Sequence, residues 1–190
     1  MAQGDLILRK NLEEFAELLP RLAVLESATG QFCEMLRHCW VGKGKVLIAG
    51  NGGSAADAMH FAEELVVRFQ KNRRALAAIA LCDPTVITCV GNDLGYENIF
   101  SRQVEALGRP GDVLILLSTS GNSENMVRAA SEAKSRGVRT IAMLGKDGGK
   151  LRGQCDLQLI VPSDITHHIQ EAHKIIYHAI CEWADAECEA

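Results

Sequence analysis

One stretch, KVLIAGNGGSAADAMHFAEELVVRF at residues 45–69, constrains the fold of this chain more than any other. Residues 46–49 are a short apolar run of the kind that forms a buried strand, and the GNGG sequence at residues 50–53 cannot continue that strand. Ser54 is a good N-cap for the amphipathic helix that should follow. Free backbone N–H groups and the positive end of the helix dipole then point to one place, so the stretch predicts an anion-binding cradle.

The helix predicted after this turn carries His60 and Glu64, which are one turn apart and share a face near the cradle. An imidazole and a carboxylate at this spacing suit a divalent metal ion that takes further ligands from elsewhere. Glu64 can instead move a proton next to a carbonyl group. A hydrogen-bonded pair on a helix surface has the same spacing, so these interpretations stay open. Glu63 lies about 100° further round the helix, and we do not expect it in the site.

Apolar runs of strand length recur along the chain and alternate with amphipathic stretches of helix length. The predicted strands are residues 46–49, 77–81, 113–117, 138–144 and 157–161. The predicted helices between and after them cover residues 54–69, 85–90, 98–107, 124–136 and 169–187, with Asp83-Pro84 as a start signal and Gly91-Asn92-Asp93 as a break. This alternation favours an α/β fold, a three-layer sandwich with a parallel sheet covered on both faces.

Residues 5–40 precede the first strand and have a helical pattern of apolar side chains. Pro20 and Gly30 predict a kink or a break, which gives one long bent helix or two shorter helices forming an N-terminal hairpin. This segment has no place inside the sheet, and its apolar face is of the kind that packs on a partner subunit. We therefore expect a single domain over residues 1–190, with oligomerisation helices at 1–42 and the α/β core at 43–190.

Charge and composition exclude several classes of function. The chain has 190 residues, a net charge of −4 and 47% hydrophobic residues, so it lacks the basic field that favours nucleic acid or an anionic membrane. No apolar run approaches the roughly 20 residues of a membrane span. Asp5 and Arg9 interrupt the one candidate for a signal peptide, and the seven cysteines, none in a C-x-x-C pair, are typical of reduced, mostly buried thiols. We expect a cytoplasmic protein.

A second polar loop, STSGNS at residues 118–123, also lies between a predicted buried strand and a predicted helix. The hydroxyl groups of Ser118, Thr119, Ser120 and Ser123, together with the first amides of the helix, suit a phosphate group. The loop lacks the lysine of a P-loop, so nucleotide hydrolysis is not indicated. An ordinary serine-rich loop has the same composition. Two donor-rich loops at the carboxyl ends of strands nevertheless favour a ligand site, because ligands of open α/β sheets bind there.

The segment at residues 167–178 holds four of the six histidines. Gln170 and His178 are eight residues apart, which places them roughly 80° apart round a continuous helix and about 12 Å apart along it. They can face one cleft, yet they reach a common ion only by stretching towards each other. A solvated, histidine-rich helix face is the alternative that this spacing leaves open.

Five motifs in order resemble those of one family: GNGGSAADAMHFAEEL, VGND, LSTSGNSENMV, GKDGGKL, and IQEAH followed by a further histidine. They closely resemble the motifs of phosphoheptose isomerases, members of the sugar-isomerase (SIS) domain superfamily, and the resemblance covers nearly the whole chain. It implies a five-stranded parallel sheet of flavodoxin-like order. It also implies a homotetramer with active sites between subunits, in which the N-terminal helices join the tetramer core.

The activity that the resemblance implies is conversion of D-sedoheptulose 7-phosphate to D-glycero-D-manno-heptose 7-phosphate through an enediol or enediolate. This is the first step towards the activated heptose of bacterial surface polysaccharides such as lipopolysaccharide. A carboxylate can take the C1 proton and an imidazole can serve the sugar oxygens. The family often carries zinc, one ion per subunit, which can polarise a carbonyl as a Lewis acid.

The resemblance also implies roles for single residues, matched by position. The phosphate site is Ser118, Thr119, Ser120 and Ser123. The other substrate contacts are Asn51, Gly52, Gly53, Ser54, Glu64, Asn92, Asp93 and Gln170. Glu64 is the general base and His178 the general acid. The zinc ligands are His60, Glu64, Gln170 and His178, so Glu64 and His178 have two implied roles.

One departure and two alternatives accompany this interpretation. Family members commonly carry arginine where this chain has His168, which puts fine substrate contacts or local subunit packing in doubt. A non-catalytic relative binds a replication initiator, but it lacks the glutamate and the C-terminal histidine that stand here as Glu64 and His178. Other SIS isomerases and lyases act on different sugar phosphates and have other sequences around the two loops.

Overall fold

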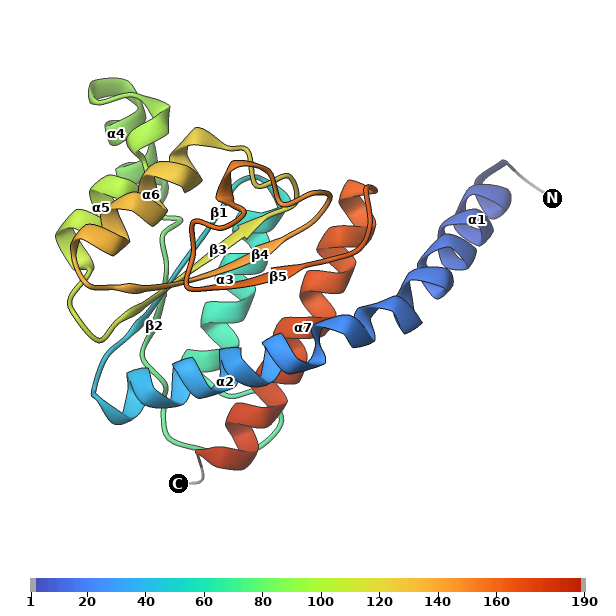
Figure 1. Ribbon diagram of the computed structural model, residues 1–190, viewed down its shortest axis with the longest axis horizontal. Helices are drawn as coiled ribbons and strands as arrows, with labels where there is room; N and C mark the ends of the chain where they lie inside the picture. The colour runs from blue at the N-terminus through green and yellow to red at the C-terminus, as the bar shows by residue number, and fades with distance from the viewer. Residues whose placement is uncertain (1–2, 189–190) are drawn as a thin grey trace.

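A five-stranded parallel sheet forms the centre of the computed structural model, which describes residues 3–188 (Figure 1). The strands are β1 (Val46–Gly50), β2 (Ala78–Ala80), β3 (Val113–Ser118), β4 (Arg139–Leu144) and β5 (Leu157–Ile160). Their order is β2-β1-β3-β4-β5, and every neighbouring pair is parallel. This confirms the expected sheet and its flavodoxin-like order. β1 and β3 are buried over their full lengths, as expected for strands covered on both faces.

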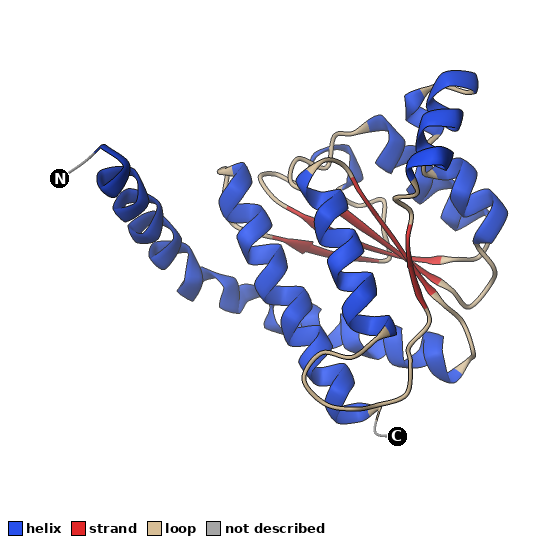
Figure 2. Cartoon of the chain, turned by 180° about the vertical axis from the view of Figure 1, so that it is seen from behind, coloured by secondary structure: helices blue, strands red, loops and turns tan. Residues whose placement is uncertain are grey.

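Helices cover both faces of the sheet, which confirms the three-layer sandwich. Alternate side chains of β1 enter two separate cores: Val46 and Ile48 in one, Leu47 and Ala49 in the other. The first core is completed by α2 (Glu26–Val41), α3 (Gly53–Val66) and α7 (Thr166–Glu187), and Figure 2 shows α3 and α7 side by side in front of the sheet. The second is completed by α4 (Pro84–Asp93), α5 (Ser101–Leu107) and α6 (Glu124–Ser135).

The N-terminal helices are confirmed, but they do not fold back on each other as the expected hairpin would. α1 (Gln3–Leu18) leads through the 3₁₀ helix η1 (Leu19–Leu25) into α2, and α1 projects away from the body of the molecule (Figure 1). The kink falls at Pro20, which has no N–H to continue the α-helix. Because η1 is itself helical, the chain bends there without reversing. Gly30 lies inside α2 and does not interrupt it.

Two expected helix boundaries are wrong and one is confirmed. Gly52, at φ +55°, takes the N-cap position of α3, and Ser54 lies in the first turn with its N–H donated to the Asn51 carbonyl. Gly91 does not break α4, which continues to Asp93. Asp83 does start α4, because its carboxylate accepts the N–H groups of the second and third helical residues.

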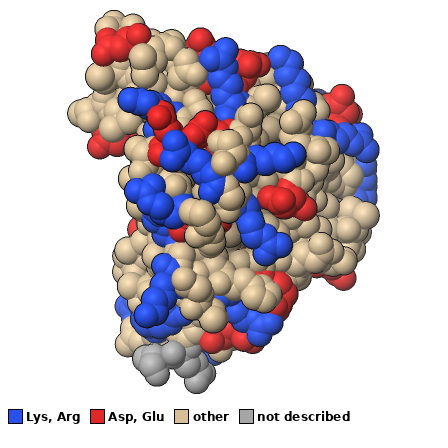
Figure 3. Space-filling model, turned by 60° about the vertical axis from the view of Figure 1, so that its left-hand side comes forward, with Lys and Arg blue, Asp and Glu red and all other residues tan. Residues whose placement is uncertain are grey.

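Three general properties of the chain follow from the described residues. Among them, no helix combines the length and the hydropathy that a membrane span requires. Basic and acidic side chains are mixed over the face shown in Figure 3. All seven cysteines are free thiols, as expected, although only Cys33, Cys39 and Cys181 are fully buried.

One buried histidine ties α7 to the sheet. His173 is 1% exposed, and its Nε2 lies 3.1 Å from the carbonyl oxygen of Leu144, the last residue of β4. Burial lowers the pKa of His173 to about 4, although the hydrogen bond to Leu144 acts in the opposite direction. The imidazole is therefore neutral at pH 7 and donates its Nε2–H to the carbonyl oxygen.

This histidine makes the stability of the fold depend on pH. An unfolded chain protonates histidine at a pKa near 6.5, so between pH 6.5 and pH 4 the unfolded state binds more protons than the folded one. The free energy of unfolding should therefore fall with decreasing pH, by up to about 3 kcal/mol from this group. Urea unfolding at pH 7 and pH 4.5 measures the loss. His173→Asn should lose less stability over this range than wild type. His38→Asn, at an exposed position, should behave like wild type.

Candidate active site

The two donor-rich turns predicted from the sequence meet at one edge of the sheet. β1 and β3 are adjacent and parallel, with Gly50 opposite Leu117, so the turns that follow them lie side by side. A cleft of about 210 Å³ opens between these turns and the start of α7. Its lining residues are Asn51, Ser54, Leu117, Ser118, Thr119, Ser120, Ser123, Thr166 and Gln170. The cleft therefore brings together all four predicted hydroxyl donors, and its lining contains no lysine or arginine.

Hydrogen bonds within the serine loop, residues 118–123, hold its shape. The N–H of Gly121 donates to Ser118 Oγ at 3.0 Å, and the N–H of Asn122 donates to Ser120 Oγ at 3.2 Å. Ser123 occupies the N-cap position of α6, yet its hydroxyl makes no capping hydrogen bond. The hydroxyl groups and the N-terminus of this twelve-residue helix therefore converge on the cleft, an arrangement suited to a dianion.

The GKDGGKL motif packs against the serine loop from outside. Gly121 has φ +63°, and a Cβ there would lie 1.9 Å from the carbonyl oxygen of Gly148. The N–H of Lys150 donates to Asn122 Oδ1, and the N–H of Leu151 donates to the Gly121 carbonyl at 3.0 Å. Only glycine at position 121 permits this close approach of the two backbones.

Two residues that sequence reasoning missed fix the side chain of Asn51. The amide groups of Asn51 and Asn125 exchange two hydrogen bonds of 3.0 Å, and the Tyr96 hydroxyl donates to Asn51 Oδ1 at 3.1 Å. The sequence could have indicated Asn125 as a site residue, because it lies in the first turn of the helix that follows the serine loop. Nothing in the sequence around Tyr96 points to Asn51, which is 45 residues away.

Gln170 lies against the glycine turn, and its predicted role as a metal ligand stays a prediction. A Cβ on Gly53 would lie 2.6 Å from Gln170 Nε2, so glycine is needed there to admit this side chain. A second cleft of about 310 Å³ begins at this point and runs between α3 and α7, lined by Gly53, Ala56, Asp57, His167, Gln170, Glu171 and Lys174. Gln170 borders both clefts. His178 is two turns further along α7, about 12 Å away along the axis.

The other three predicted metal ligands come together where α3 packs on α7. One ligand atom from each of His60, Glu64 and His178 lies within 4.8 Å of the other two, and His60 Nε2 is 3.1 Å from Glu64 Oε1. His178 Nε2 is buried and has no hydrogen-bond partner in the described chain. Two imidazoles and a carboxylate, with a buried nitrogen unpaired, form a donor set that fits a catalytic zinc with an open coordination position. We call these three residues the trio.

A buried tyrosine supports the trio from behind. The Tyr177 hydroxyl lies 3.2 Å from His60 Nδ1 and 3.4 Å from Asp57 Oδ1. A metal ion on His60 Nε2 would require the Nδ1–H tautomer, in which Nδ1–H donates to the Tyr177 oxygen while the Tyr177 hydroxyl donates to the Asp57 carboxylate; without an ion, a protonated Nε2 donates to Glu64. Outer partners of this kind fix the tautomer and orientation of a metal-binding histidine. Sequence reasoning did not identify Asp57 or Tyr177.

Burial lowers the pKa of His178 below its ordinary value, and the neighbouring His60 acts in the same direction. Glu64 opposes this shift, since a carboxylate favours the charged imidazolium. The net effect keeps the His178 ring neutral at pH 7. A neutral imidazole can bind a metal ion, or accept a proton and later return it.

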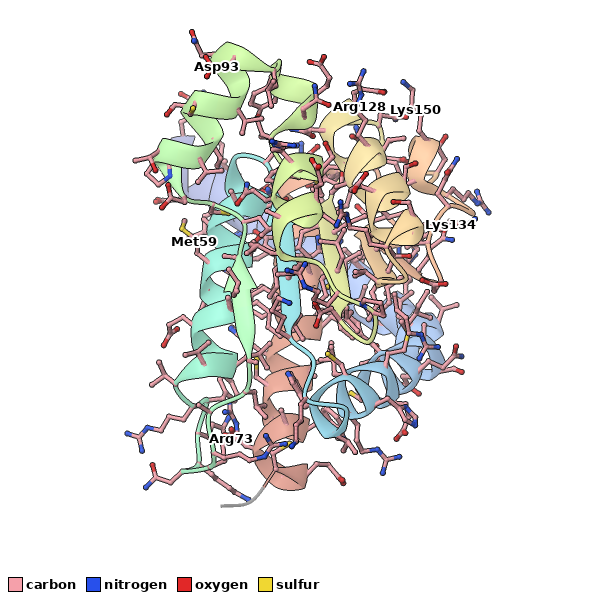
Figure 4. All side chains as sticks on the ribbon, turned by 90° about the vertical axis from the view of Figure 1, so that its left-hand side faces the viewer. Met59, Arg73, Asp93, Arg128, Lys134 and Lys150 are labelled. Carbon is pink, nitrogen blue, oxygen red and sulfur yellow. The ribbon has the colours of Figure 1, made fainter. Side chains whose placement is uncertain are left out.

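Asn92 and Asp93 lie at the exposed end of α4, away from both clefts. Asn92 Nδ2 donates to Asp93 Oδ1 at 2.7 Å, and Cys89 lies 3.5 Å from the other Asp93 oxygen. Figure 4 places Asp93 at the outer tip of this helix, at the opposite end of the view from Arg73. No described hydrogen bond links either residue to the cradle, so their contact with a ligand stays a prediction.

His168, the departure from the family pattern, has a packing role in this structure. It is 2% exposed and lies between Glu171, at 2.7 Å, and Glu14 of α1, at 3.4 Å. The ring of Phe15 packs against it, with 5.5 Å between ring centroids. His168 thus joins α1 to the start of α7, which is the local packing that the substitution put in doubt.

Comparisons with known proteins agree with this geometry. The family model of the SIS domain matches residues 12–145. A phosphoheptose isomerase of Fusobacterium nucleatum is 48% identical over 176 residues, which cover 93% of this chain and 87% of that protein. The structure of a phosphoheptose isomerase from Neisseria gonorrhoeae superposes with a TM-score of 0.90 at 40% identity, covering 97% of this chain and all of that one. One from Francisella tularensis gives 0.93 at 38% identity, covering 98% and 100%.

The close approach of Gly121 to Gly148 allows a direct test of whether the serine loop binds phosphate. Gly121→Ala should displace the serine loop, because its Cβ cannot occupy a position 1.9 Å from the Gly148 oxygen. We expect affinity for inorganic phosphate, measured by isothermal titration calorimetry, to fall at least tenfold. Gly153→Ala is the matched control: its φ of +77° imposes similar backbone strain, but its Cβ meets nothing within 4 Å. Equal phosphate affinity in the two variants would show that the serine loop does not bind phosphate.

Proposed function

The chain belongs to the phosphoheptose isomerase family of SIS-domain proteins and is an isomerase, and we propose that it converts D-sedoheptulose 7-phosphate to D-glycero-D-manno-heptose 7-phosphate. One observation carries the proposal. The cleft at the serine loop and the glycine turn, which we call the phosphate cradle, shares Gln170 with the cleft between α3 and α7, and the trio lies further along the same two helices. Along α3, Gly53 and His60 are separated by seven residues, about 10 Å. An extended seven-carbon sugar with a terminal phosphate has a similar length, about 10 Å.

The substrate phosphate binds in the cleft at the serine loop. Ser118, Thr119, Ser120 and Ser123 donate hydrogen bonds to the dianion, and the N-terminus of α6 adds the favourable end of its dipole. Asn51 and Gln170 border the same cleft and contact the adjoining carbons. The sugar chain then follows the second cleft past Asp57 and Lys174 towards the trio.

Glu64 and His178 carry out the proton transfers at the reactive end. The Glu64 carboxylate takes the proton from C1, and the electron pair of that C–H bond forms the C1–C2 double bond of an enediolate with its negative charge on O2. His178 moves the proton between O1 and O2. Glu64 then returns its proton to C2, so that C1 becomes the aldehyde and no atom is gained or lost. The trio places a carboxylate and an imidazole within 4.8 Å of each other, close enough to serve adjacent carbons.

One zinc ion per chain is part of the proposal. His60, Glu64 and His178 would hold it, and a bound zinc would polarise the substrate carbonyl as a Lewis acid. Gln170, predicted as a fourth ligand, borders the cleft at the serine loop, and its place among the zinc ligands stays part of the prediction. Elemental analysis of protein purified without chelator should find one zinc per chain, and the content should fall in His60→Ala.

We propose a homotetramer with active sites between subunits. Leu6, Ile7, Leu8 and Leu12 on the projecting α1 are each at least half exposed, and an apolar groove of about 460 Å³ lies between η1 and α7. Apolar surface of this extent on a projecting helix favours contact with other copies of the chain. Light scattering should give the mass of four chains, and a monomer at micromolar concentration would contradict the proposal.

The pathway and location follow from the reaction. The product is a heptose phosphate, and we propose that it feeds the activated heptose of a bacterial surface polysaccharide such as lipopolysaccharide. A doubly charged sugar phosphate does not cross membranes unaided, so the enzyme works where the substrate is made, in the cytoplasm.

Two other functions are not favoured. A non-catalytic protein that binds a replication initiator has no use for Glu64 and His178, and here both are present and adjacent. Another SIS isomerase or lyase is not favoured either, because a Listeria monocytogenes protein named as a sugar-phosphate isomerase is 15% identical and similar in fold alone, whereas the three phosphoheptose isomerases compared above are 38–48% identical. Incubation with D-sedoheptulose 7-phosphate, followed by NMR, should show an aldose phosphate. No turnover, together with tight binding to another protein, would favour the non-catalytic function.

Replacing the base tests the mechanism. Glu64→Gln keeps the size of the side chain but removes the basic carboxylate, so turnover should fall by at least a thousandfold. Sugar-phosphate affinity and the assembly state should be retained, because the cradle and α1 are untouched. Glu63→Gln is the matched control, since Glu63 is exposed on the adjacent position of the same helix and should keep full activity. Loss of assembly in Glu64→Gln would instead show that Glu64 has a structural role.

A further inference from the structure

A buried ion pair joins the loop after α3 to the last turns of α7. Arg73 Nε donates to Asp185 Oδ1 at 2.9 Å, and the two side chains are 0% and 2% exposed. Figure 4 shows Arg73 in the loop beyond the C-terminal end of α3, beside α7. Neither residue lines the two clefts described above.

Each partner also holds a piece of backbone next to the trio. The guanidinium of Arg73 donates to the carbonyl oxygens of Glu64, at 2.6 Å, and Leu65, at 2.8 Å. These carbonyls belong to the last turn of α3, where no following helical N–H can reach them. Arg73 therefore caps the C-terminus of α3 at the residue that carries the proposed base.

Asp185 acts on His178, the member of the trio that α7 carries, through Phe69. Its carboxylate accepts the N–H groups of Phe69, at 3.4 Å, Gln70, at 2.6 Å, and Lys71, at 2.8 Å. The Phe69 ring stacks on His178 with 5.4 Å between centroids and 25° between planes. The position of the loop therefore sets where the Phe69 ring packs against one face of the His178 imidazole.

The chemistry of the pair agrees with a fixed geometry. Burial raises the pKa of Asp185, but the hydrogen bonds from Lys71, Gln70, Phe69 and Arg73 lower it more, so the group is ionised. A buried ion pair is weak grounds for a stability role, because apolar residues of similar volume often replace such pairs without loss. Apolar residues cannot replace the hydrogen bonds that Asp185 accepts from the loop at residues 69–71 and that Arg73 donates to the α3 carbonyls.

We propose that Arg73 and Asp185 are positioning residues that hold Glu64 and His178 in register for proton transfer and zinc binding. The inference rests on the proposed function of the trio. Arg73 and Asp185 touch no reacting atom; they act through the Glu64 backbone and through Phe69. Errors of about 1 Å in such placement can cost a hundredfold in rate.

The chain offers a matched control in a second ion pair, of which the carboxylate is buried. Lys45 Nζ lies 2.5 Å from Asp112 Oδ2, and Asp112 is 3% exposed. Asp112 also accepts the N–H groups of Lys45, at 2.9 Å, and Arg109, at 2.8 Å, so it resembles Asp185 in its bonding. It lies at the amino ends of β1 and β3, at the opposite edge of the sheet from the cradle, and none of its described bonds reaches α3 or α7.

Comparison of Asp185→Asn with Asp112→Asn tests the proposal. Both should lower the Tm, and both are assayed at a temperature where circular dichroism shows them folded. In Asp185→Asn we expect kcat to fall at least tenfold and zinc affinity, measured by competition with a chromophoric chelator, to fall at least tenfold. The KM for the sugar phosphate should stay within twofold, because the cradle is untouched. In Asp112→Asn all three quantities should stay within twofold of wild type.

Two further variants keep the test decisive if Asp185→Asn does not fold. Arg73→Lys keeps the charge but has a single nitrogen, which cannot reach Asp185 and both carbonyls together, so kcat should fall. Phe69→Leu leaves the ion pair intact and removes the stacked ring, and it should weaken zinc binding. If these variants match Asp112→Asn in kcat and zinc affinity, the pair is structural only and the proposal is overturned. If wild type itself binds zinc but does not turn over the sugar, the proposed function fails, and zinc affinity still decides the role of the pair.

Discussion

Tyr177 stacks its ring on Phe61, with 5.1 Å between centroids, and turns its hydroxyl towards His60. This contact joins α7 to α3, and the rest of the site depends on it. The two helices come from opposite ends of the core sequence, yet their packing brings His178 within reach of His60 and Glu64. The same packing places Gln170, two helical turns before His178 on α7, beside the glycine turn that precedes α3. A single interface therefore sets both the reactive end of the site and its distance from the phosphate cradle.

The parallel sheet supplies the other half of the arrangement. Because β1 and β3 are neighbours, the glycine turn and the serine loop are brought together by strand pairing alone. Neutral donors can hold a phosphate group there, since the helix N-terminus contributes the positive end of a dipole. The trio, in contrast, is built from side chains that must be held individually. That difference explains why the support of the trio includes the buried Tyr177, Asp57 and the ion pair of Arg73 with Asp185.

Much of this was predictable from the sequence, for physical reasons. Buried parallel strands are continuous apolar runs, so the strands of the sheet could be predicted. The turns after β1 and β3 could be predicted from their glycine and serine residues. The i, i+4 spacing of His60 and Glu64 made their pairing a local property of one helix. The residues that escaped prediction, such as Tyr96, Tyr177 and Arg73, contact partners 45, 117 and 112 residues away. Such contacts arise from helix packing, and no local sequence pattern predicts them. The path of α1 was missed because a seven-residue 3₁₀ helix replaces the expected turn.

The central claim is that one small sugar phosphate reaches from the serine loop to the trio. A crystal structure of the Glu64→Gln variant with D-sedoheptulose 7-phosphate tests it most directly. The account predicts phosphate oxygens on the hydroxyl groups of residues 118–123, with C1 and C2 of the same molecule beside residue 64 and His178. A phosphate bound elsewhere, or a sugar whose C1 end points away from α3, would contradict it.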